Sequence, residues 1–307
     1  MMKKIVIAGG SGFLGNILIQ NLKSYVEEIV VLSRTVKTSY ENIHFIKWNG
    51  KTIAGWSKEV DGCDVLINLS GRSVDCRYNK KNKSEILTSR INSTKVLGKA
   101  IQQSTHPPQI WINSSTATIY RHSMDKKMNE VTGELGHGFS VEVAKAWEAA
   151  FFSFNTPKTR KVALRTSIVL GKEGGAITPI KNLAKLGFGG KQGNGKQFVS
   201  WIHEKDFAKS VLFIIKNENI TGVINIVAPT PTTNETLMEK IRHKMAIPFG
   251  IPLNRIFLEM GARLINTETE LILKSRNVIP TKLIEAGFEH DFSTLDSALD
   301  NLLSSKS

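Results

Sequence analysis

Cysteine is scarce in this sequence, and the scarcity excludes several kinds of protein. Only two cysteines, Cys63 and Cys76, occur among 307 residues. A fold held by disulfides needs several pairs, so two thiols in a chain of this size indicate reduced cysteines in a cytoplasmic protein. The seven histidines are scattered, and no His/Cys cluster has the spacing of metal ligands. We therefore expect no disulfide framework and no metal site.

Long hydrophobic runs are also missing. The N-terminal apolar stretch, residues 5–8, ends at glycines. It is too short for the core of a signal peptide, which needs roughly 7–15 residues, or for a membrane span, which needs about 20. We therefore expect a soluble, cytoplasmic protein with no membrane partner.

Acidic residues are in deficit. Aspartate and glutamate number 27 against 41 lysines and arginines, which gives a formal net charge of +14. This excess suits nucleic acid, acidic lipid or a phosphate-bearing cofactor. However, the basic residues are spread along the chain, and the densest cluster, residues 80–83, has no interleaved aromatics. We expect a basic cleft for a small ligand and no nucleic-acid partner.

The first half does contain a regular alternation of short apolar runs and helix-like stretches. Strands are predicted at residues 3–8, 28–32, 43–47, 64–69, 109–113 and 161–165, and helices at 13–22, 84–103 and 139–152. Strand, helix, strand at this spacing indicates βαβ units and a parallel sheet. The predicted fold class is α/β, a doubly wound Rossmann sheet with a smaller C-terminal α+β lobe.

The amino-acid composition changes after about Gly171, where glycines, prolines and polar residues become more frequent. We expect a Rossmann domain over residues 1–170, and residues 205–228 are a candidate for a return to it. Residues 171–307 then form a substrate lobe. No repeat or low-complexity linker separates the halves, so the second should pack on the first.

A glycine-rich loop joins the first predicted strand to the first helix, with the spacing Gly9, Gly12, Gly15. The first glycine permits a tight turn, the second lets the backbone approach a pyrophosphate, and the third allows helix and strand to pack closely. The helix N-terminus offers N–H groups and a positive dipole end to the phosphates. This context predicts a dinucleotide site. Its expected contacts are Gly9, Ser11, Gly12, Phe13, Leu14 and Gly15.

The end of the second strand indicates which dinucleotide binds. NAD sites usually place a carboxylate about 20 residues after the loop, whereas this chain has Ser33 and Arg34, with Lys37 nearby. A guanidinium grips a 2′-phosphate with a bidentate fork. We therefore expect NADP(H) as the cofactor, held by Ser33 and Arg34; the alternative is that Arg34 is a solvated loop cation.

Beyond the fourth strand the chain resembles an extended or atypical short-chain dehydrogenase/reductase. Residues 68–71, Asn-Leu-Ser-Gly, stand where that superfamily has Asn-Ala-Ala-Gly, and residues 113–120 resemble the segment after its fifth strand. The resemblance gives Thr116 the place of the catalytic hydroxyl. It also implies cofactor contacts from Leu69, Ser70, Gly71 and Ser114.

A narrower resemblance is to an epimerase-like family with a C-terminal domain of unknown function, often labelled NAD-dependent epimerase/dehydratase or cell-division-inhibitor homologue. It is carried by Arg77 with Tyr78, residues 89–94, Trp147 with Glu148, 164–171, Gly174 with Gly175, 200–206, 228–231 and Gly287 with Phe288. It covers essentially the whole chain. It implies that Arg165 lies at the cofactor and that residues 250–307 form the family-specific C-terminal domain.

The superfamily's proton-transfer pair, Tyr-x-x-x-Lys on one helix, is absent from the whole sequence. Spacing of four places both side chains on one helix face, where the ammonium lowers the tyrosine pKa. On the expected helix, one register pairs Phe139 with Val143 and the other pairs Ser140 with Ala144. Lys145 is near, but on the wrong face. Ordinary reductase or epimerase catalysis therefore needs another proton donor.

Three residues are candidates for that catalytic role. Thr116 and Tyr120 follow the fifth strand, at the edge where a parallel sheet binds ligands, and His203 could titrate near neutral pH. Tyr120 can equally be a packed aromatic with a satisfied hydroxyl, and His203 can cap a helix. Glu148 is expected to be a structural partner.

Four residues are candidates for contact with the substrate. Arg77 and Arg90 could hold an anionic group, although surface salt bridges are the alternative. Lys196 lies in a glycine-rich loop, residues 188–198, before Trp201. Such a loop can close over a ligand or form a surface hairpin.

Two functions remain open. The first is an NADP(H)-dependent oxidoreductase or nucleotide-sugar epimerase-like enzyme with a small-molecule substrate. The second is a catalytically altered NADPH-binding regulatory or sensor module that acts through a protein partner. Many proteins of this fold dimerise, so a homodimer is one expected assembly.

Overall fold

The β-branched runs of the first half form a parallel sheet. The computed structural model describes residues 1–35, 37–264 and 268–304. Within them, seven strands have the order β10-β6-β5-β4-β1-β2-β3, all parallel. The strands are β1 (Met2–Ala8), β2 (Val26–Ser33), β3 (Ile43–Lys47), β4 (Val65–Asn68), β5 (Ile110–Thr116), β6 (Arg160–Thr166) and β10 (Gly222–Ile226). The order 3-2-1-4-5-6 is that of a Rossmann sheet, so the predicted fold class is confirmed.

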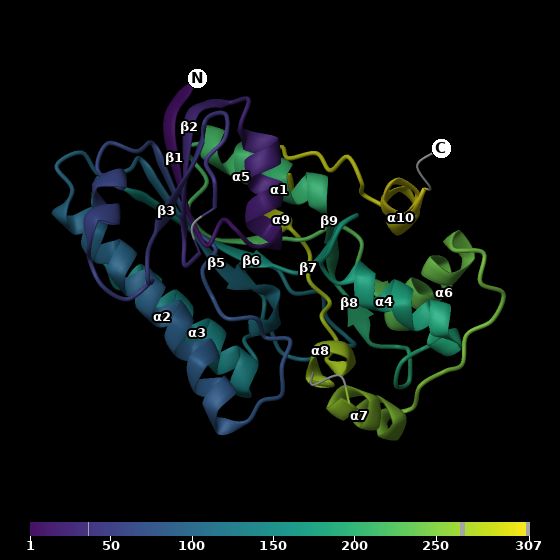
Figure 1. Cartoon of the computed structure of the whole chain (residues 1–307). Coiled ribbons are helices and arrows are strands. Elements are labelled where there is room, and N and C mark those ends of the chain that lie inside the picture. Colours follow the sequence, from purple (N-terminus) through teal and green to yellow (C-terminus); the bar gives the residue numbers. More distant parts are fainter. Residues whose placement is uncertain (36, 265–267, 305–307) are drawn as a thin grey trace.

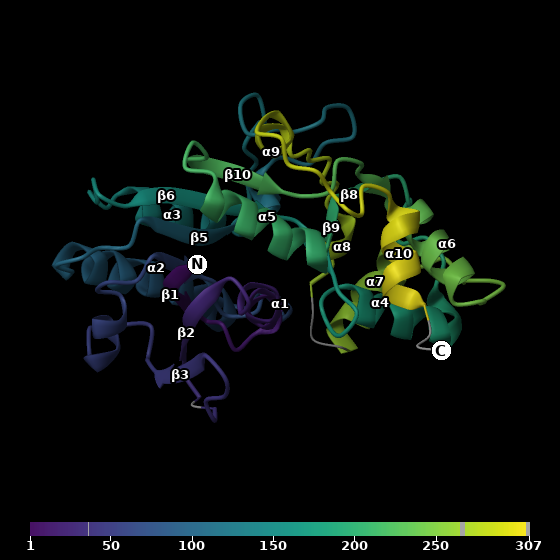
Figure 2. The same ribbon diagram turned by 90° about the horizontal axis from the view of Figure 1, so that it is seen from above.

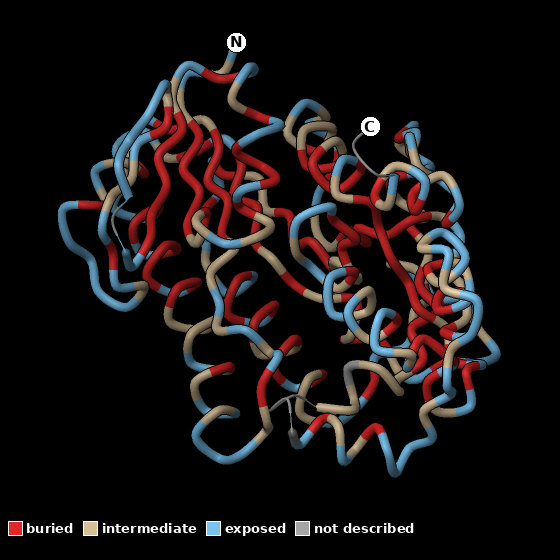
Figure 3. Tube along the Cα trace, turned by 45° about the vertical axis from the view of Figure 1, so that its right-hand side comes forward, coloured by how far each residue is buried: buried red, intermediate tan, exposed pale blue. Residues whose placement is uncertain are grey.

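Helices cover both faces of this sheet (Figures 1 and 2). On one face lie α1 (Phe13–Leu22) and α5 (Glu204–Lys216), and on the other α2 (Lys80–Gln103) and α3 (Phe139–Phe152). Side chains alternate between the faces, so β1 sends Ile5 and Ile7 to the first and Val6 and Ala8 to the second. A parallel sheet buried on both faces needs such near-continuous apolar strands. Figure 3 shows buried residues following the strands.

Several predicted bounds agree with the structure, namely the helices at 13–22 and 139–152 and the strand at 43–47. The helix predicted at 84–103 begins earlier, at Lys80. The reason is local: the Asn79 side chain accepts a hydrogen bond from the N–H of Asn82 and caps the helix start. Strand β5 is also longer than predicted, because it pairs with β6 as far as Thr116.

The second half builds a smaller lobe beside the sheet (Figure 1). Its short strands pair as β7 (Ile168–Leu170) with β9 (Trp201–His203) and β8 (Phe198–Val199) with β11 (Thr232–Thr233). The remaining helices are α4 (Ile177–Leu183), α6 (Asn234–Lys244), α7 (Arg255–Leu264), α8 (Glu270–Leu273), α9 (Thr281–Glu285) and α10 (Leu295–Leu303), with the short helices η1 (Gly55–Glu59), η2 (Ala117–Ile119) and η3 (Ala184–Phe188). None of the described helices is long and apolar enough to cross a membrane.

The chain returns to the first half after entering the lobe. Helix α5 packs beside α1, and β10 pairs with β6 at the edge of the sheet. Residues 204–226 are therefore part of the Rossmann layers, although residues 168–203 belong to the lobe. Along the chain, this part of the lobe lies between β6 and α5.

A buried ion pair joins α3 to the sheet. The Nε and Nη2 atoms of Arg165, on β6, donate to the two carboxylate oxygens of Glu148, on α3, at 2.8 Å each. The Nη1 atom donates to the Tyr120 hydroxyl at 3.0 Å, and that hydroxyl donates to Oδ1 of Asn225, on β10, at 3.0 Å. Ser115 on β5 also donates to Glu148 at 2.6 Å. One network therefore ties together α3, β5, β6 and β10.

Replacing Glu148 with glutamine should lower the free energy of unfolding by about 3–5 kcal/mol, because the Arg165 guanidinium would stay buried without its counter-ion. The matched control is Glu142→Gln on the same helix. Its partner, Lys145, and Glu142 itself are exposed, so the control should cost less than about 1 kcal/mol. Urea unfolding followed by circular dichroism measures both; equal losses would contradict a special role for the buried pair.

Candidate functional site

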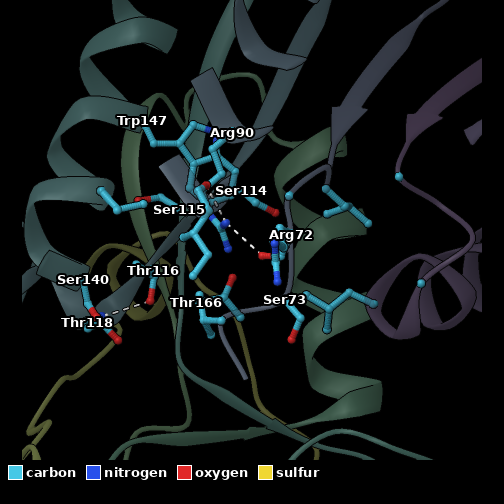
Figure 4. Close-up of a pocket in the computed structure, with 18 of the residues that line it drawn as sticks. Arg72, Ser73, Arg90, Ser114, Ser115, Thr116, Thr118, Ser140, Trp147 and Thr166 are labelled. Carbon is cyan, nitrogen blue, oxygen red and sulfur yellow. Dashed lines mark hydrogen bonds between the residues drawn. The ribbon is translucent and has the colours of Figure 1, made fainter. Parts of the chain in front are cut away.

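A cleft of about 540 Å³ opens at the carboxyl ends of β1, β4, β5 and β6. Its walls are the loops that follow these strands, together with cleft-facing residues of α2 and α3 (Figure 4). Strands β1 and β4 are neighbours, and the chain order of the sheet reverses between them. Ligands of open α/β sheets bind at this kind of crossing. The cleft therefore lies where the fold predicts a ligand.

The three glycines of the first loop have different steric roles. Gly9 has a φ of +77°, and a Cβ there would lie 2.9 Å from the Ser70 nitrogen. A Cβ on Gly15 would lie 2.2 Å from the Gly10 carbonyl oxygen, so helix and loop pack too closely for any side chain. A Cβ on Gly12 would meet no protein atom nearer than 3.7 Å. Of these three glycines, only Gly12 faces open space.

That open space lies at the start of α1. Gly12 is the N-cap of the helix, and no side chain caps its first N–H groups. Gly9, Gly12, Phe13, Leu14 and Gly15 all line the cleft, whereas Ser11 does not. An uncapped helix N-terminus beside a side-chain-free surface fits a pyrophosphate. The loop therefore has the shape that a dinucleotide needs.

The end of β2 brings Arg34 to the same edge of the sheet. The Gly9 N–H donates to the Leu32 carbonyl at 2.8 Å, so the glycine loop and the end of β2 are adjacent. Ser33 is buried and its hydroxyl donates to the Thr35 carbonyl, while Arg34 is exposed outside the cleft lining. Residues 33–35 contain no carboxylate.

The segments after β4 and β5 also lie where the sequence predicts. Leu69, Gly71, Ser114 and Thr116 line the cleft. Thr116 accepts a hydrogen bond from the Thr118 N–H at 3.1 Å and keeps its hydroxyl at the cleft surface (Figure 4). Ser70 does not line the cleft, and in the described part of the chain its buried hydroxyl has no partner.

Two residues predicted for the site, Tyr120 and Arg165, lie inside the protein instead. Both are members of the network around Glu148, and neither lines the cleft. Tyr120 is 2% exposed, and burial raises the pKa of its phenol. The packed-aromatic interpretation therefore matches Tyr120. Arg165 does not reach the cleft because its donors are directed to Glu148 and Tyr120.

His203 is also remote from the cleft. It caps α5, where its Nδ1 accepts from the Lys205 N–H at 3.1 Å, and its ring stacks on Phe292 with a centroid distance of 3.7 Å. Burial lowers the pKa of His203 to about 4, against an opposing hydrogen bond to Asn301. The structure agrees with the alternative of a capping role.

Of the four predicted substrate residues, only Arg90 lines the cleft. Trp201 is fully buried in the core of the smaller lobe, and its Nε1 donates to the Thr230 carbonyl at 3.1 Å. Arg77 pairs with Glu268, with Nη1 to Oε2 at 3.4 Å. Lys196 is exposed outside the lining. Arg77, Trp201 and Lys196 are therefore not brought to the cleft.

Helix α3 shows which side chains replace the missing Tyr–Lys pair. Phe139, Val143 and Trp147, four residues apart, share the face that lines the cleft, and Ser140 lines it as well. Lys145 is directed away, because its ammonium donates to the Gly136 carbonyl at 3.0 Å. The face that would carry a phenol and an ammonium is thus apolar apart from Ser140.

One phenol that was not among the predicted site residues does line the cleft. Tyr78 precedes α2, and its ring packs edge-on against Phe139 at a centroid distance of 4.9 Å. Burial raises the pKa of Tyr78, while a hydrogen bond with the Ser140 side chain opposes the shift. The Tyr78 N–H donates to Glu268 at 2.6 Å, and the Ser140 hydroxyl donates to Glu270 at 3.3 Å. Two acidic residues of the C-terminal segment thus hold this wall.

The described residues contain no group of three or more His, Cys, Asp and Glu side chains that could hold a metal ion. The polar side chains that line the cleft include the hydroxyls of serine, threonine and tyrosine residues and the guanidinium groups of Arg72 and Arg90.

Known protein families match most of this chain. A model of the NAD dependent epimerase/dehydratase family matches residues 5–226. The chain belongs to this family. A domain of unknown function, DUF1731, matches residues 255–302, so the family resemblance inferred from the sequence is confirmed.

Curated relatives match along nearly their whole length. An epimerase family protein of Bacillus subtilis, YfhF, is 31% identical over 306 residues, which are 98% of each chain. The mouse epimerase family protein SDR39U1 is also 31% identical over 306 residues, 98% of this chain and 99% of the mouse protein.

Solved structures extend the comparison. The human epimerase family protein SDR39U1 (isoform 2), crystallised with NADPH, has a TM-score of 0.85 at 27% identity and covers 98% of this chain and 99% of its own. The UDP-N-acetylglucosamine 4-epimerase of Bacillus cereus has a TM-score of 0.75 at 18% identity, covering 98% of each chain. The second likeness concerns the fold alone.

Replacing His203 with asparagine should make the protein less sensitive to acid. The pKa of His203 in the folded protein, about 4, lies below the ordinary histidine pKa of 6.5. The stability that the neutral ring contributes is therefore fully present above pH 6.5 and is lost as the pH falls through 4. Asparagine keeps a side-chain cap for α5 but does not titrate. Urea unfolding at neutral pH and near pH 5 measures the difference; an equal loss in wild type and variant would contradict the assignment.

Proposed function

We propose that the protein binds NADP(H) in the cleft and acts as an NADP(H)-dependent oxidoreductase or epimerase-like enzyme on a small molecule. The observation that carries the proposal is the open space at Gly12, in front of the uncapped start of α1. A phosphate there would accept backbone N–H groups and face the positive end of the helix dipole. The human relative that was crystallised with NADPH supports the same cofactor.

The preference for NADP(H) over NAD(H) rests on Arg34. It follows β2 at the edge shared with the glycine loop, and no carboxylate stands beside it. A carboxylate there would bond the ribose of NAD and repel a 2′-phosphate, whereas a guanidinium attracts it.

When bound, the nicotinamide would supply hydride transfer, and the chain would supply the proton. Thr116 and Tyr78 are two hydroxyl-bearing residues of the cleft lining. Burial raises the pKa of Tyr78, so the phenol is protonated at neutral pH and would donate its proton to an oxygen that becomes strongly basic during hydride transfer. The Ser140 hydroxyl links this phenol to Glu270 and gives the proton a path toward the C-terminal segment.

A second function, an NADPH-binding regulatory or sensor module, is favoured by one observation. The face of α3 that lines the cleft presents Phe139 and Val143 in place of a Tyr–Lys pair. Such a module would bind the cofactor without turnover. Sustained NADPH oxidation with a carbonyl probe would exclude it.

Replacing Arg34 with alanine should weaken NADPH binding by about 1.5–3 kcal/mol, roughly ten- to a hundredfold, and leave NADH binding nearly unchanged, because only NADPH carries the 2′-phosphate. Calorimetric titration with both cofactors measures this. Lys37→Ala removes a second exposed cation close by and should change NADPH affinity much less. Equal loss for NADPH and NADH in the Arg34 variant would reject the specificity assignment.

Replacing Tyr78 with phenylalanine should leave NADPH affinity and stability near wild type and reduce NADPH oxidation with phenanthrenequinone roughly 10²–10⁴-fold, the range for loss of a positioned proton donor. Tyr120→Phe is the matched control. It removes a buried hydroxyl from the Arg165 network and should cost about 1–3 kcal/mol of stability instead. Undiminished turnover in the Tyr78 variant would point to Thr116.

A further inference from the structure

Arg90 differs from the other arginines around the cleft in having no acidic partner. Arg165 pairs with Glu148, Arg72 with Glu85 and Arg77 with Glu268. Among the described residues, Arg90 forms no ion pair with a carboxylate. Its Nη1 donates to the carbonyl oxygens of Arg72 and Ile86, at 3.0 Å each, and both acceptors are neutral.

The surroundings of Arg90 make this cation costly. Its guanidinium lies over the Trp147 ring at 5.0 Å, and a Cβ on Gly71 would come within 3.1 Å of its Cζ. Burial lowers the pKa of Arg90 to about 10. Arg90 is half-buried, and a partly desolvated cation is stabilised by a counter-ion and by hydrogen bonds to its remaining donors. The two neutral carbonyl oxygens leave the other donors of the guanidinium for a further acceptor.

The open side of the guanidinium faces the cleft. Arg90 lines it from α2, between Trp147 on α3 and Arg72 in the loop after β4 (Figure 4). An arginine fork in this position matches a phosphate or a carboxylate, each of which accepts two parallel hydrogen bonds.

We infer that Arg90 is a binding site for an acidic group, a phosphate or carboxylate, of the ligand in the cleft. The inference rests on the proposed function for the identity of that ligand. Two sources have this chemistry: the pyrophosphate of the dinucleotide, because Arg90 packs under Gly71 next to the predicted cofactor path, and an acid group of the substrate. In the second case the substrate is an anionic carbonyl or hydroxyl compound.

The test compares Arg90→Gln and Arg90→Lys with Lys99→Gln. Lys99 is exposed on the same helix, so its loss controls for one unit of net charge. Each protein is titrated calorimetrically with NADPH, and its NADP⁺-saturated form with oxalate. Arg90→Gln should lower the affinity for one of these two ligands at least about tenfold, because a charge-assisted hydrogen bond is lost. Arg90→Lys should restore part of that affinity. Lys99→Gln should match wild type.

The two titrations distinguish the two sources of the acidic group, the dinucleotide and the substrate. A loss confined to NADPH assigns the dinucleotide phosphates, and a loss confined to oxalate assigns an acidic substrate. Wild-type affinity for both ligands in a folded Arg90→Gln protein would overturn the inference.

The inference and the proposed function can fail separately. If wild type binds neither NADPH nor NADP⁺, the proposed function fails, and titrating the cofactor-free proteins with inorganic pyrophosphate and oxalate then decides the Arg90 site. Loss of binding in Arg90→Gln would keep the site, and unchanged or absent binding would remove it.

Thermal unfolding of the ligand-free proteins gives an independent readout. Because Arg90 has no carboxylate partner in the described structure, Arg90→Gln should unfold at the same temperature as wild type or higher. A lower unfolding temperature together with unchanged ligand affinities would show that Arg90 is structural.

Discussion

The ion pair between Arg165 and Glu148 is the interaction on which the shape of the cleft depends. It attaches α3 to β6, and the Tyr120 hydroxyl continues the contact to Asn225 on β10. The cleft wall consists of side chains on the same helix, so a change in the pair would shift the wall. A buried pair of this kind contributes little net stability compared with apolar packing, but removing one partner leaves an uncompensated buried charge.

Arg165 and Arg90 are two arginines with different roles. The Arg165 guanidinium donates hydrogen bonds to both Glu148 and Tyr120. Arg90 is half-buried and has only two carbonyl oxygens as acceptors. The first arrangement holds α3 on the sheet, and the second leaves guanidinium donors available for the acidic ligand group that we infer.

The sequence predicted best those parts of the site whose residues are consecutive along the chain. The glycine loop, residues 69–71 and residues 114–116 each follow a strand, and a parallel sheet brings all such junctions to one edge. Tyr120 matches the packed-aromatic alternative and not the catalytic one, because the short helix η2 separates it from β5 and the chain leaves the edge there. His203 matches the helix-cap alternative, because its side chain accepts the Lys205 N–H at the start of α5.

Contacts between distant segments could not be predicted from sequence. Tyr78 meets Glu268, 190 positions away, and Ser140 meets Glu270, 130 positions away. No periodicity or motif connects such pairs, because their proximity depends on how the second half packs on the first. Arg77 is similar, since only the fold reveals that Glu268 engages it. Local patterns therefore identified the cofactor side of the cleft and left its opposite wall unassigned.

The C-terminal segment supports the cleft wall, so the two family regions cannot be exchanged independently. Residues of the DUF1731 region reach into the wall of the cleft: Glu268 bonds Tyr78, Glu270 bonds Ser140, and Lys274 and Arg276 bond the carbonyl and hydroxyl oxygens of Thr118 at 2.9 and 3.0 Å. The cleft itself is lined by the other family region. Recombination that joined this Rossmann region to a foreign C-terminus would remove three sets of wall contacts at once. A foreign C-terminal region would therefore have to supply equivalent contacts to Tyr78, Ser140 and Thr118 to keep this wall.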